Sequence, residues 1–392
     1  MKRKMTKIIA GAAVAAGVFL FSAPGADAGG VKYSSGDKYV KLGGRIQIQY
    51  HLSDTDQGAT SDNVAFRRLR PYIEGTVHEN WFGKFQWDMG EAVDGGEIAI
   101  KDAYLRYTGF KDMTITAGNG YTIPFSREAL TSSKYQQLVE RTFVGDHNYG
   151  TPDRQLGLIV EGHLADKKLT YGFGVASASI DPDSKKLDFD TPVNKNADFN
   201  EGVMYGARVD IHPFGFLKLS QGDFARDDLK ATLSVAGFGW NNDGDNNTRT
   251  GAGKVATKVT KADVENVAGG EVSGAVRYMG ASVDVEYNFI TADTVDPTVT
   301  SGIYRNGTTE LKNFAAEGGY MVLPSRLELV AGYQIQDADG YAKNWTRTSV
   351  GANWFFKKHD IKVQATYRMG ENKDGTDGND IDELFVQAQY VF

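Results

Sequence analysis

The stretch VKLGGRIQIQY, Val40–Tyr50, alternates apolar and polar side chains residue by residue. In an extended strand successive side chains point to opposite faces. One face would therefore carry Leu42, Ile46, Ile48 and Tyr50, and the other would carry Lys41, Arg45, Gln47 and Gln49. Segments of about ten residues with one apolar and one polar face are typical of transmembrane β-barrels, in which lipid lies outside and water inside. We therefore predict an all-β protein, a transmembrane antiparallel β-barrel.

The same alternation recurs along the chain. It is clear in residues 66–77, 81–89, 98–107, 281–289, 361–369 and 384–392. It is weaker in residues 113–119, 154–162, 168–178, 203–211, 229–239, 271–278, 313–321, 326–335 and 346–356. Together these segments predict about sixteen strands, an even number as in bacterial barrels.

The links between these segments alternate in length, short then long, as periplasmic turns and extracellular loops do. The short links are residues 78–80, 108–112, 165–168, 279–280, 322–325 and 357–360. One link does not fit, because residues 212–228 are too many for a tight turn; we expect a short helix or an extended turn there.

The first 28 residues have the features of a signal peptide. A basic start, MKRKMTK, precedes an apolar run from Ile8 to Phe21 and a small-residue cleavage site, Ala26–Ala28. We expect a short N-terminal segment over residues 29–39 and the barrel domain over 40–392. Removing the signal from 43 basic and 50 acidic residues leaves a net charge of about −10. The absence of Cys excludes disulfides and thiolate metal sites.

The longest interruption of the pattern is GYTIPFSREALTSSKYQQLVERTFVGDHNYGTP, Gly120–Pro152. It is polar, and its central part carries Arg127, Lys134 and Arg141. Alternation stops before this stretch and resumes at Arg154. We interpret it as a long third extracellular loop that folds into the lumen and narrows a water-filled pore.

Several motifs resemble those of the phosphate-selective porin family, the phosphate- and polyphosphate-specific channels of Gram-negative bacteria. They are Phe66–Arg70, Glu74–Thr76, Asp102–Leu105, Pro124–Ser126, Thr131–Ser133, Val139–Arg141 and Arg154–Gly157. The resemblance is dense from about residue 40 to 165 and thinner afterwards. It implies a sixteen-stranded barrel in the outer membrane, a homotrimer, an inward third loop, and basic side chains that guide an anion through a constriction.

The candidate anion pathway consists of basic side chains on the lumen-facing positions of the strands and on the loop. We predict Arg45, Arg68, Arg70, Lys84, Arg106, Arg208 and Arg368 on strands, with Arg127, Lys134 and Arg141 on the loop. Arginine suits this role because its planar fork replaces an oxyanion's water with paired N–H donors and stays charged. The alternative for each residue is an ion pair with a lumen acid that only braces the wall. Arg67 falls on the lipid-facing positions, where it would reach an interface.

These residues predict passive diffusion of small oxyanions such as phosphate, with selenite, arsenate or sulfate also compatible. Two alternatives remain: a general unselective porin, or a barrel that sheathes a periplasmic or outer-membrane cytochrome. The chain has no G-x-S-x-G or HExxH motif, so we expect no enzyme. We expect contact with outer-membrane lipid and lipopolysaccharide, and no nucleic acid, cofactor or metal.

Overall fold

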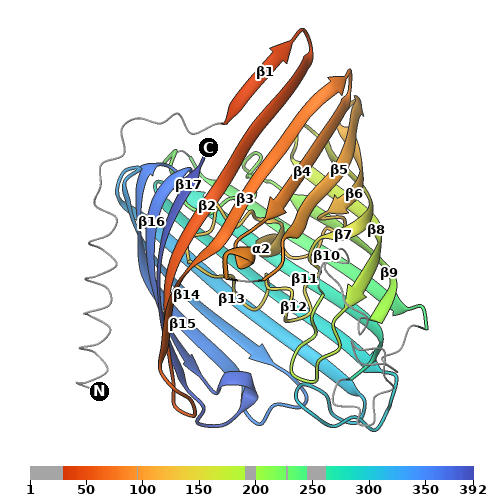
Figure 1. Cartoon of the computed structure of the whole chain (residues 1–392), viewed down its shortest axis with the longest axis vertical. Coiled ribbons are helices and arrows are strands. Elements are labelled where there is room, and N and C mark those ends of the chain that lie inside the picture. Colours follow the sequence, from red (N-terminus) through yellow and green to blue (C-terminus); the bar gives the residue numbers. More distant parts are fainter. Residues whose placement is uncertain (1–29, 95, 190–199, 227, 245–261) are drawn as a thin grey trace.

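The computed structural model describes residues 30–392 except 95, 190–199, 227 and 245–261, so the expected signal peptide lies outside the described residues. Sixteen antiparallel strands, β2 to β17, form a closed barrel (Figure 1), which confirms the predicted fold class and strand number. Their bounds are β2 (Lys38–Thr55), β3 (Ser61–His78), β4 (Trp81–Asp88), β5 (Ala99–Phe110), β6 (Met113–Gly120), β7 (Gln155–Leu164), β8 (Leu169–Ile180), β9 (Asn200–Ile211), β10 (Lys230–Asn242), β11 (Val264–Tyr278), β12 (Ala281–Thr294), β13 (Thr308–Leu323), β14 (Leu327–Asp337), β15 (Trp345–Lys357), β16 (Ile361–Glu371) and β17 (Ile381–Val391).

The ring closes where the last strand pairs with the first. β17 runs antiparallel to β2, from Ile381 opposite Thr55 to Val391 opposite Arg45. Phe392 and Gly44 then exchange two backbone hydrogen bonds, of 2.9 and 3.0 Å. This pairing leaves no open edge in the ring, as a bilayer requires.

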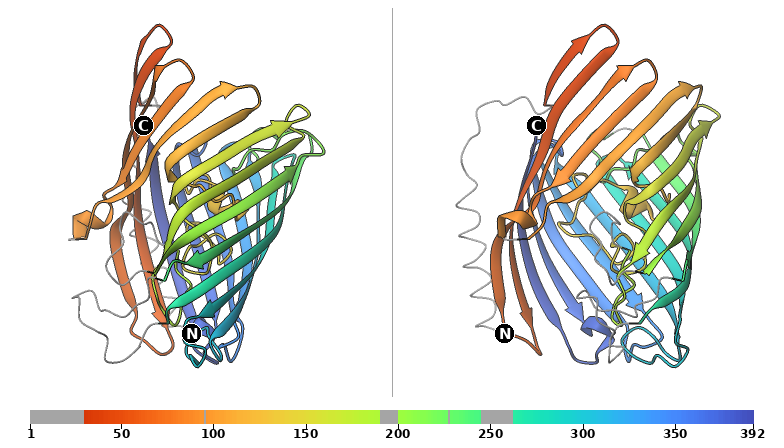
Figure 2. Two further views of the ribbon diagram at one scale, coloured as in Figure 1. Left: turned by 90° about the vertical axis from the view of Figure 1, so that its right-hand side faces the viewer. Right: turned by 45° about the vertical axis from the view of Figure 1, so that its right-hand side comes forward.

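A short additional strand, β1 (Val31–Ser35), forms a hairpin with the start of β2. It pairs with β2 beyond the point where β17 ends. The hairpin projects past the barrel rim, as both views of Figure 2 show.

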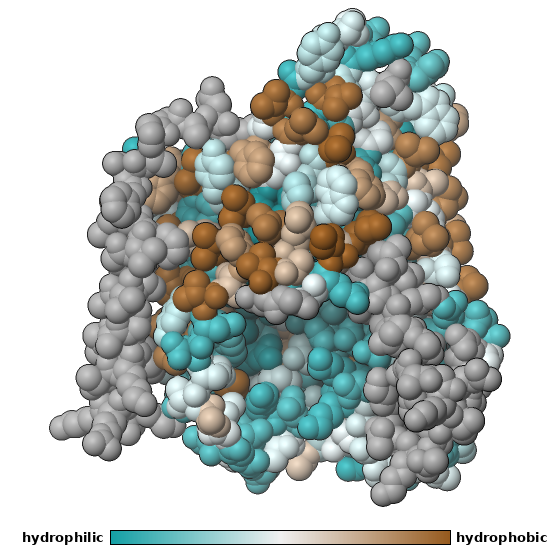
Figure 3. Space-filling model, in the orientation of Figure 1, coloured by the Kyte–Doolittle hydropathy of each residue, from teal (hydrophilic) through white to brown (hydrophobic). Residues whose placement is uncertain are grey.

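The two faces of the strands differ as the alternation predicts. Leu42, Leu105 and Leu233 are 52%, 60% and 63% exposed on the outer face, whereas Gln47 and Gln364 are buried on the inner face. Figure 3 shows hydrophobic surface gathered over β2–β5 and hydrophilic surface toward the end with the long loops. Within the described residues, none of the helices combines the length and apolarity needed to cross a bilayer.

Tight turns join the strands at one end of the barrel, which is the periplasmic end in outer-membrane barrels. Several of these turns place a non-glycine residue in the left-handed region, including Asn80, Asp112 and Ser325 with φ near 60°. The link between β9 and β10 differs from them. Its described residues, 212–226 and 228–229, contain no helix, so of the two expected forms the extended one is correct.

An apolar cluster lies inside the barrel, between the wall and the start of the long loop. Ile123 and Phe125 of that loop pack with Phe238 and Trp240 of β10, and the Phe125 and Phe238 rings are 4.7 Å apart. The Trp240 indole N–H donates to the Ala178 carbonyl at 3.1 Å. The contact between the Phe125 and Phe238 rings joins the start of the loop to β10.

Candidate functional site

Residues 121–154 leave β6, run along the inner wall opposite it, and return to β7. One helical turn, α2 (Arg127–Leu130), starts this path with Ser126 as its N-cap. The backbone N–H groups of Ser126 and Arg127 donate to Glu271 at 2.7 and 3.2 Å, and that of Glu128 donates to Glu286 at 2.9 Å. The first N–H groups of a helical turn lack backbone partners, and carboxylates of β11 and β12 supply them.

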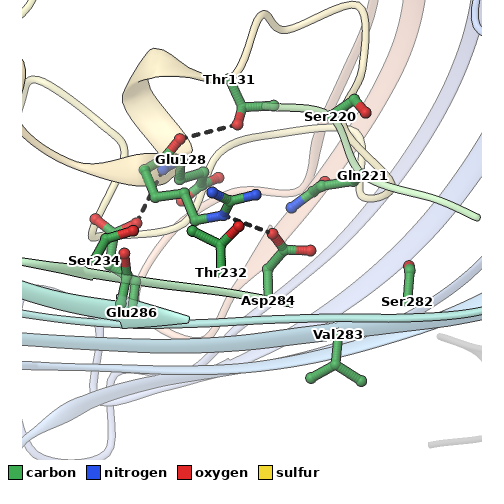
Figure 4. Close-up of polar contacts among 12 residues, drawn as sticks. Glu128, Thr131, Ser220, Gln221, Thr232, Ser234, Ser282, Val283, Asp284 and Glu286 are labelled. Atoms are coloured by element: carbon green, nitrogen blue, oxygen red, sulfur yellow. Dashed lines mark hydrogen bonds and ion pairs between the residues drawn. The ribbon is translucent and has the colours of Figure 1, made fainter. Parts of the chain in front are cut away.

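The rest of the loop is held by amide side chains of the opposite wall. The Gln137 side chain donates to Glu328 at 2.6 Å, and the Gln364 amide donates to the Gln137 carbonyl at 2.9 Å. The N–H groups of Val139 and Phe143 donate to Thr366 and Gln334 at 3.2 and 3.0 Å. Figure 4 shows the loop residues Glu128 and Thr131 lying over Asp284 and Glu286 of β12. The loop therefore contacts side chains of β11, β12, β14 and β16.

A salt bridge fastens the loop to the other side as well. Glu140 accepts from Arg67 Nε and Nη2 at 2.7 and 3.0 Å, and from the Gln49 amide at 3.0 Å. Arg67 does not follow the expected outward position, because a β-bulge shifts the register there: Gln47 opposes Arg68 but Ile48 opposes Phe66. A bulge re-aims one side chain, and here it turns Arg67 toward the loop.

Three of the predicted residues, Arg45, Arg68 and Arg70, form a compact group that we call the arginine cluster. Arg45 and Arg70 are direct cross-strand neighbours, and Arg68 lies opposite Gln47 and donates to it at 3.0 Å. Their exposed fractions are only 8%, 5% and 8%. Arg70 is paired with Asp88 at 2.6 Å, but within the described part of the chain neither Arg45 nor Arg68 forms an ion pair. Two buried positive charges therefore have no described carboxylate within ion-pair distance.

A cavity of about 180 Å³, which we call the outer cavity, lies between this cluster and the loop. Its lining is polar and contains Arg68, Arg70, Lys101, Arg141, His147 and Arg154 among other residues. Acidic side chains also line it, including Asp88 and Glu140, each in an ion pair with an arginine.

Four other predicted residues lie in ion pairs. Arg208 pairs with Glu271 and Asp210, Arg127 with Asp284, Arg368 with Glu383 and Lys84 with Asp102, at N–O distances from 2.6 to 3.7 Å. Arg208, Arg127 and Arg368 are each less than 5% exposed. These groups match the alternative raised for each candidate, a basic side chain that braces the wall.

The last three predicted residues have different environments. Arg141 donates to the carbonyls of Glu128 and Thr131, so it caps the C-terminal end of α2. Its side chain also lines the outer cavity. Lys134 lies over the Tyr135 ring, 4.6 Å from its centre. Arg106 donates to Thr116, lies 4.0 Å from Glu161, and faces a second cavity closer to the periplasmic turns.

Arg154, Lys101 and His147 line the outer cavity but were not among the predicted residues. Arg154 stacks on Tyr121 at 4.2 Å and pairs with Asp102 at 2.9 Å. The available signal was its position, since alternation resumes at Arg154 directly after the loop. No comparable signal marks His147, whose partner Asp188 belongs to the next extracellular loop.

His147 adds a pH-dependent charge to the outer cavity. Burial disfavours its protonated form, but the Asp188 carboxylate, 2.6 Å from Nδ1, outweighs burial and raises the pKa of His147 to about 10. Because the pKa is raised, the ion pair between His147 and Asp188 contributes its full stabilisation of the folded state below the unfolded-state pKa of about 6.5. This stabilisation is lost as the pH rises through about 10.

We therefore expect the contribution of His147 to the ion selectivity of the channel to stay constant from about pH 6 to pH 8 and to change near pH 10. The measurement is the reversal potential in a salt gradient at stepped pH, with His147→Gln as the control that lacks the change near pH 10. A transition of the parent protein between pH 6 and 7.5, absent from His147→Gln, would contradict the assignment.

Comparisons with known proteins found a relative in sequence and solved structures of similar fold. An uncharacterized protein of Aquifex aeolicus (strain VF5) is 24% identical over 393 residues, which cover 90% of this chain and 86% of that protein. Among solved structures, in-vitro folded OmpT, an outer membrane protein of Vibrio cholerae, has a TM-score of 0.58 at 16% identity and covers 94% of this chain and 100% of its own. The outer membrane channel DcaP of Acinetobacter baumannii has a TM-score of 0.57 at 14% identity, covering 93% and 99%.

The family model described as phosphate-selective porin O and P matches residues 40–289, which include the arginine cluster and the loop. This match confirms the resemblance noted from the sequence motifs. The chain therefore belongs to the phosphate-selective porin O and P family, and it is a porin of the Gram-negative outer membrane.

Proposed function

We propose that this porin lets small oxyanions such as phosphate diffuse passively across the outer membrane, in preference to cations. The observation that carries the proposal is the arginine cluster: Arg45 and Arg68 are buried beside the lumen and have no carboxylate partner among the described residues. A charge in a region of low dielectric acts on a passing ion more strongly than the same charge in water. An anion in the outer cavity can exchange its water for guanidinium N–H donors.

The paired groups around the cluster support passage rather than trapping. Conduction requires binding strong enough to admit the ion and weak enough to release it. Asp88 and Glu140 each neutralise one arginine at the outer cavity, which limits how tightly the cavity can bind an anion. A separate small void is lined by the acidic side chains of Glu128, Asp284, Glu286 and Glu317 together with Arg127, and none of these residues lines the outer cavity.

The remaining parts of the proposal concern assembly and partners. A trimer form of OmpT of Vibrio cholerae has a TM-score of 0.57 to this chain, and we propose a homotrimer embedded in outer-membrane lipid and lipopolysaccharide. The loop contacts along β11–β16 disfavour the alternative of a sheath around a threaded cytochrome, because the loop occupies that space.

Reversal potentials in planar bilayers test the proposal. In a tenfold potassium chloride gradient we expect a potential of the sign given by chloride permeation, and we expect added phosphate to reduce the chloride current. Sulfate, arsenate and selenite added in the same way would rank the oxyanions. A cation-selective or unselective channel would contradict the anion preference and leave the porin fold unaffected.

A further inference from the structure

The link between β9 and β10 crosses the periplasmic end of the barrel, and we call its residues 212–226 the strap. The Gln221 N–H donates to the Tyr135 carbonyl of the loop at 3.1 Å, and its side chain donates to Glu317 of β13 at 2.5 Å. Arg277 of β11 donates to the Ser220 carbonyl at 2.7 Å, and the Gly280 N–H donates to Asp223 at 2.7 Å. The strap therefore reaches from β9 to the opposite wall and covers that side of the periplasmic mouth.

On its other side the strap borders a cavity of about 620 Å³, which we call the periplasmic chamber. The chamber is open on one side and is lined by residues of β5–β9, of the loop near α2 and of the strap. Residues that line it include Pro124 and Leu130 of the loop and Phe216 and Leu219 of the strap.

The chamber differs from the outer cavity in its apolar surface. Phe216 and Leu219 are 41% and 36% exposed although they lie at the aqueous end of the barrel. Leu130, Leu217 and Tyr171 extend this surface, whereas the outer cavity has no aliphatic side chain in its lining. Exposed apolar side chains gathered in a concave site mark a place that binds apolar groups.

Cationic groups lie beside this apolar surface. Lys167 Nζ is 5.5 Å from the centre of the Phe216 ring, and within the described residues it forms no ion pair. The Arg106 side chain is 35% exposed and lies 4.0 Å from Glu161, at the limit of an ion pair. The other two cations of the lining, Arg127 and Arg208, are committed to Asp284 and Glu271.

The acidic groups of the chamber are also partly engaged. Asp112 lies 3.5 Å from His163, and Asp210 is bonded to Arg208 at 2.8 Å. The chamber therefore contains both acidic and basic groups. In the proposed function, the selection of anions is made by the arginine cluster at the outer cavity.

We propose that the periplasmic chamber is a second binding site, for organic anions that carry an aromatic or short alkyl body, with a carboxylate as head group. The carboxylate pairs with Lys167, and the apolar body lies against Phe216 and Leu219. The inference rests on the proposed anion preference for delivery of the solute, and it extends the substrate class beyond inorganic oxyanions.

Acetate and benzoate form a matched pair of probes, because they share the carboxylate and differ in the ring. We expect benzoate to reduce the single-channel chloride current at roughly one-tenth of the concentration that acetate requires, since the ring loses contact with water in the chamber. The double change Phe216→Ser with Leu219→Ser should bring the two concentrations together. Lys167→Gln should weaken both probes by a similar factor.

Phe214→Ser is the matched control, because Phe214 is exposed on the same strap but does not line the chamber. It should leave the benzoate effect unchanged. Equal potency of acetate and benzoate on the parent protein would overturn the inference, and so would an effect of Phe214→Ser equal to that of the double change.

A second measurement separates this inference from the proposed function. The chain contains no cysteine, so Leu219→Cys introduces a single reactive thiol. In detergent-solubilised protein, benzoate should slow the alkylation of this thiol several-fold, whereas acetate should not. Absence of protection in a channel that prefers anions would refute the chamber alone, and protection in a channel without anion preference would refute the proposed function alone.

Discussion

Replacing both Arg45 and Arg68 with glutamine is expected to lower the anion-to-cation permeability ratio by about tenfold, which corresponds to about 1.4 kcal/mol. Both guanidinium groups are buried, and neither has a carboxylate partner within the described residues, so their charge acts on the permeating ion. Two charges 4 Å apart interact by about 4 kcal/mol at an effective dielectric constant of 20, and screening by salt reduces this value. Glutamine keeps a hydrogen-bonding side chain at each position.

The measurement is the reversal potential in a salt gradient. Lys312→Gln is the matched control, because Lys312 is exposed at the start of β13 and pairs with Glu310 at 3.0 Å. It should leave the ratio unchanged. Arg45→Lys with Arg68→Lys separates charge from geometry and should retain the preference for anions while weakening inhibition of the chloride current by phosphate. An unchanged ratio in the glutamine variant would show that the arginine cluster does not select the ion.

Glu140→Gln is expected to release the loop from β2 and β3 and to increase single-channel conductance and current noise. Glu140 joins the loop to Arg67 and Gln49, and these are the contacts that hold the loop to the side of the arginine cluster. Burial alone would raise the pKa of Glu140, but the Arg67 charge outweighs burial and lowers that pKa below its ordinary value. Because the pKa of Glu140 is lowered, the salt bridge stabilises the folded state at any pH above the unfolded-state pKa. This stabilisation is lost only as the pH falls through the lower pKa of the folded state.

The coupling between Arg67 and Glu140 is expected to be about 1–2 kcal/mol, below the value for a fully buried pair because the Arg67 side chain is 41% exposed. A double-mutant cycle with Arg67→Gln, Glu140→Gln and the combined change measures it through the free energy of unfolding in urea and detergent. Glu310→Gln provides a control at an exposed ion pair. If the combined change equals the sum of the single changes, the two side chains do not act together.

The sequence by itself determined the barrel, because the period of two is a local property of each strand. Val40–Tyr50 and the other alternating segments can satisfy both lipid and water only as strands with a fixed outward face. The lengths of the links between predicted strands identified the periplasmic turns and the unusual link at residues 212–228. The sequence also placed Arg45, Arg68 and Arg70 on the inner face, because their positions follow from the same period.

Only the tertiary structure decided which charges are neutralised. Arg208 and Arg68 have the same strand pattern, but Arg208 meets Glu271 of β11, on the far side of β10, and Arg68 meets the neutral Gln47. The bulge that turns Arg67 toward Glu140 breaks the period of two, so a pattern based on that period places Arg67 on the wrong face. Partners from 63 to 228 residues apart in the chain are brought together by closure of the ring and by the path of the loop, which no local pattern encodes.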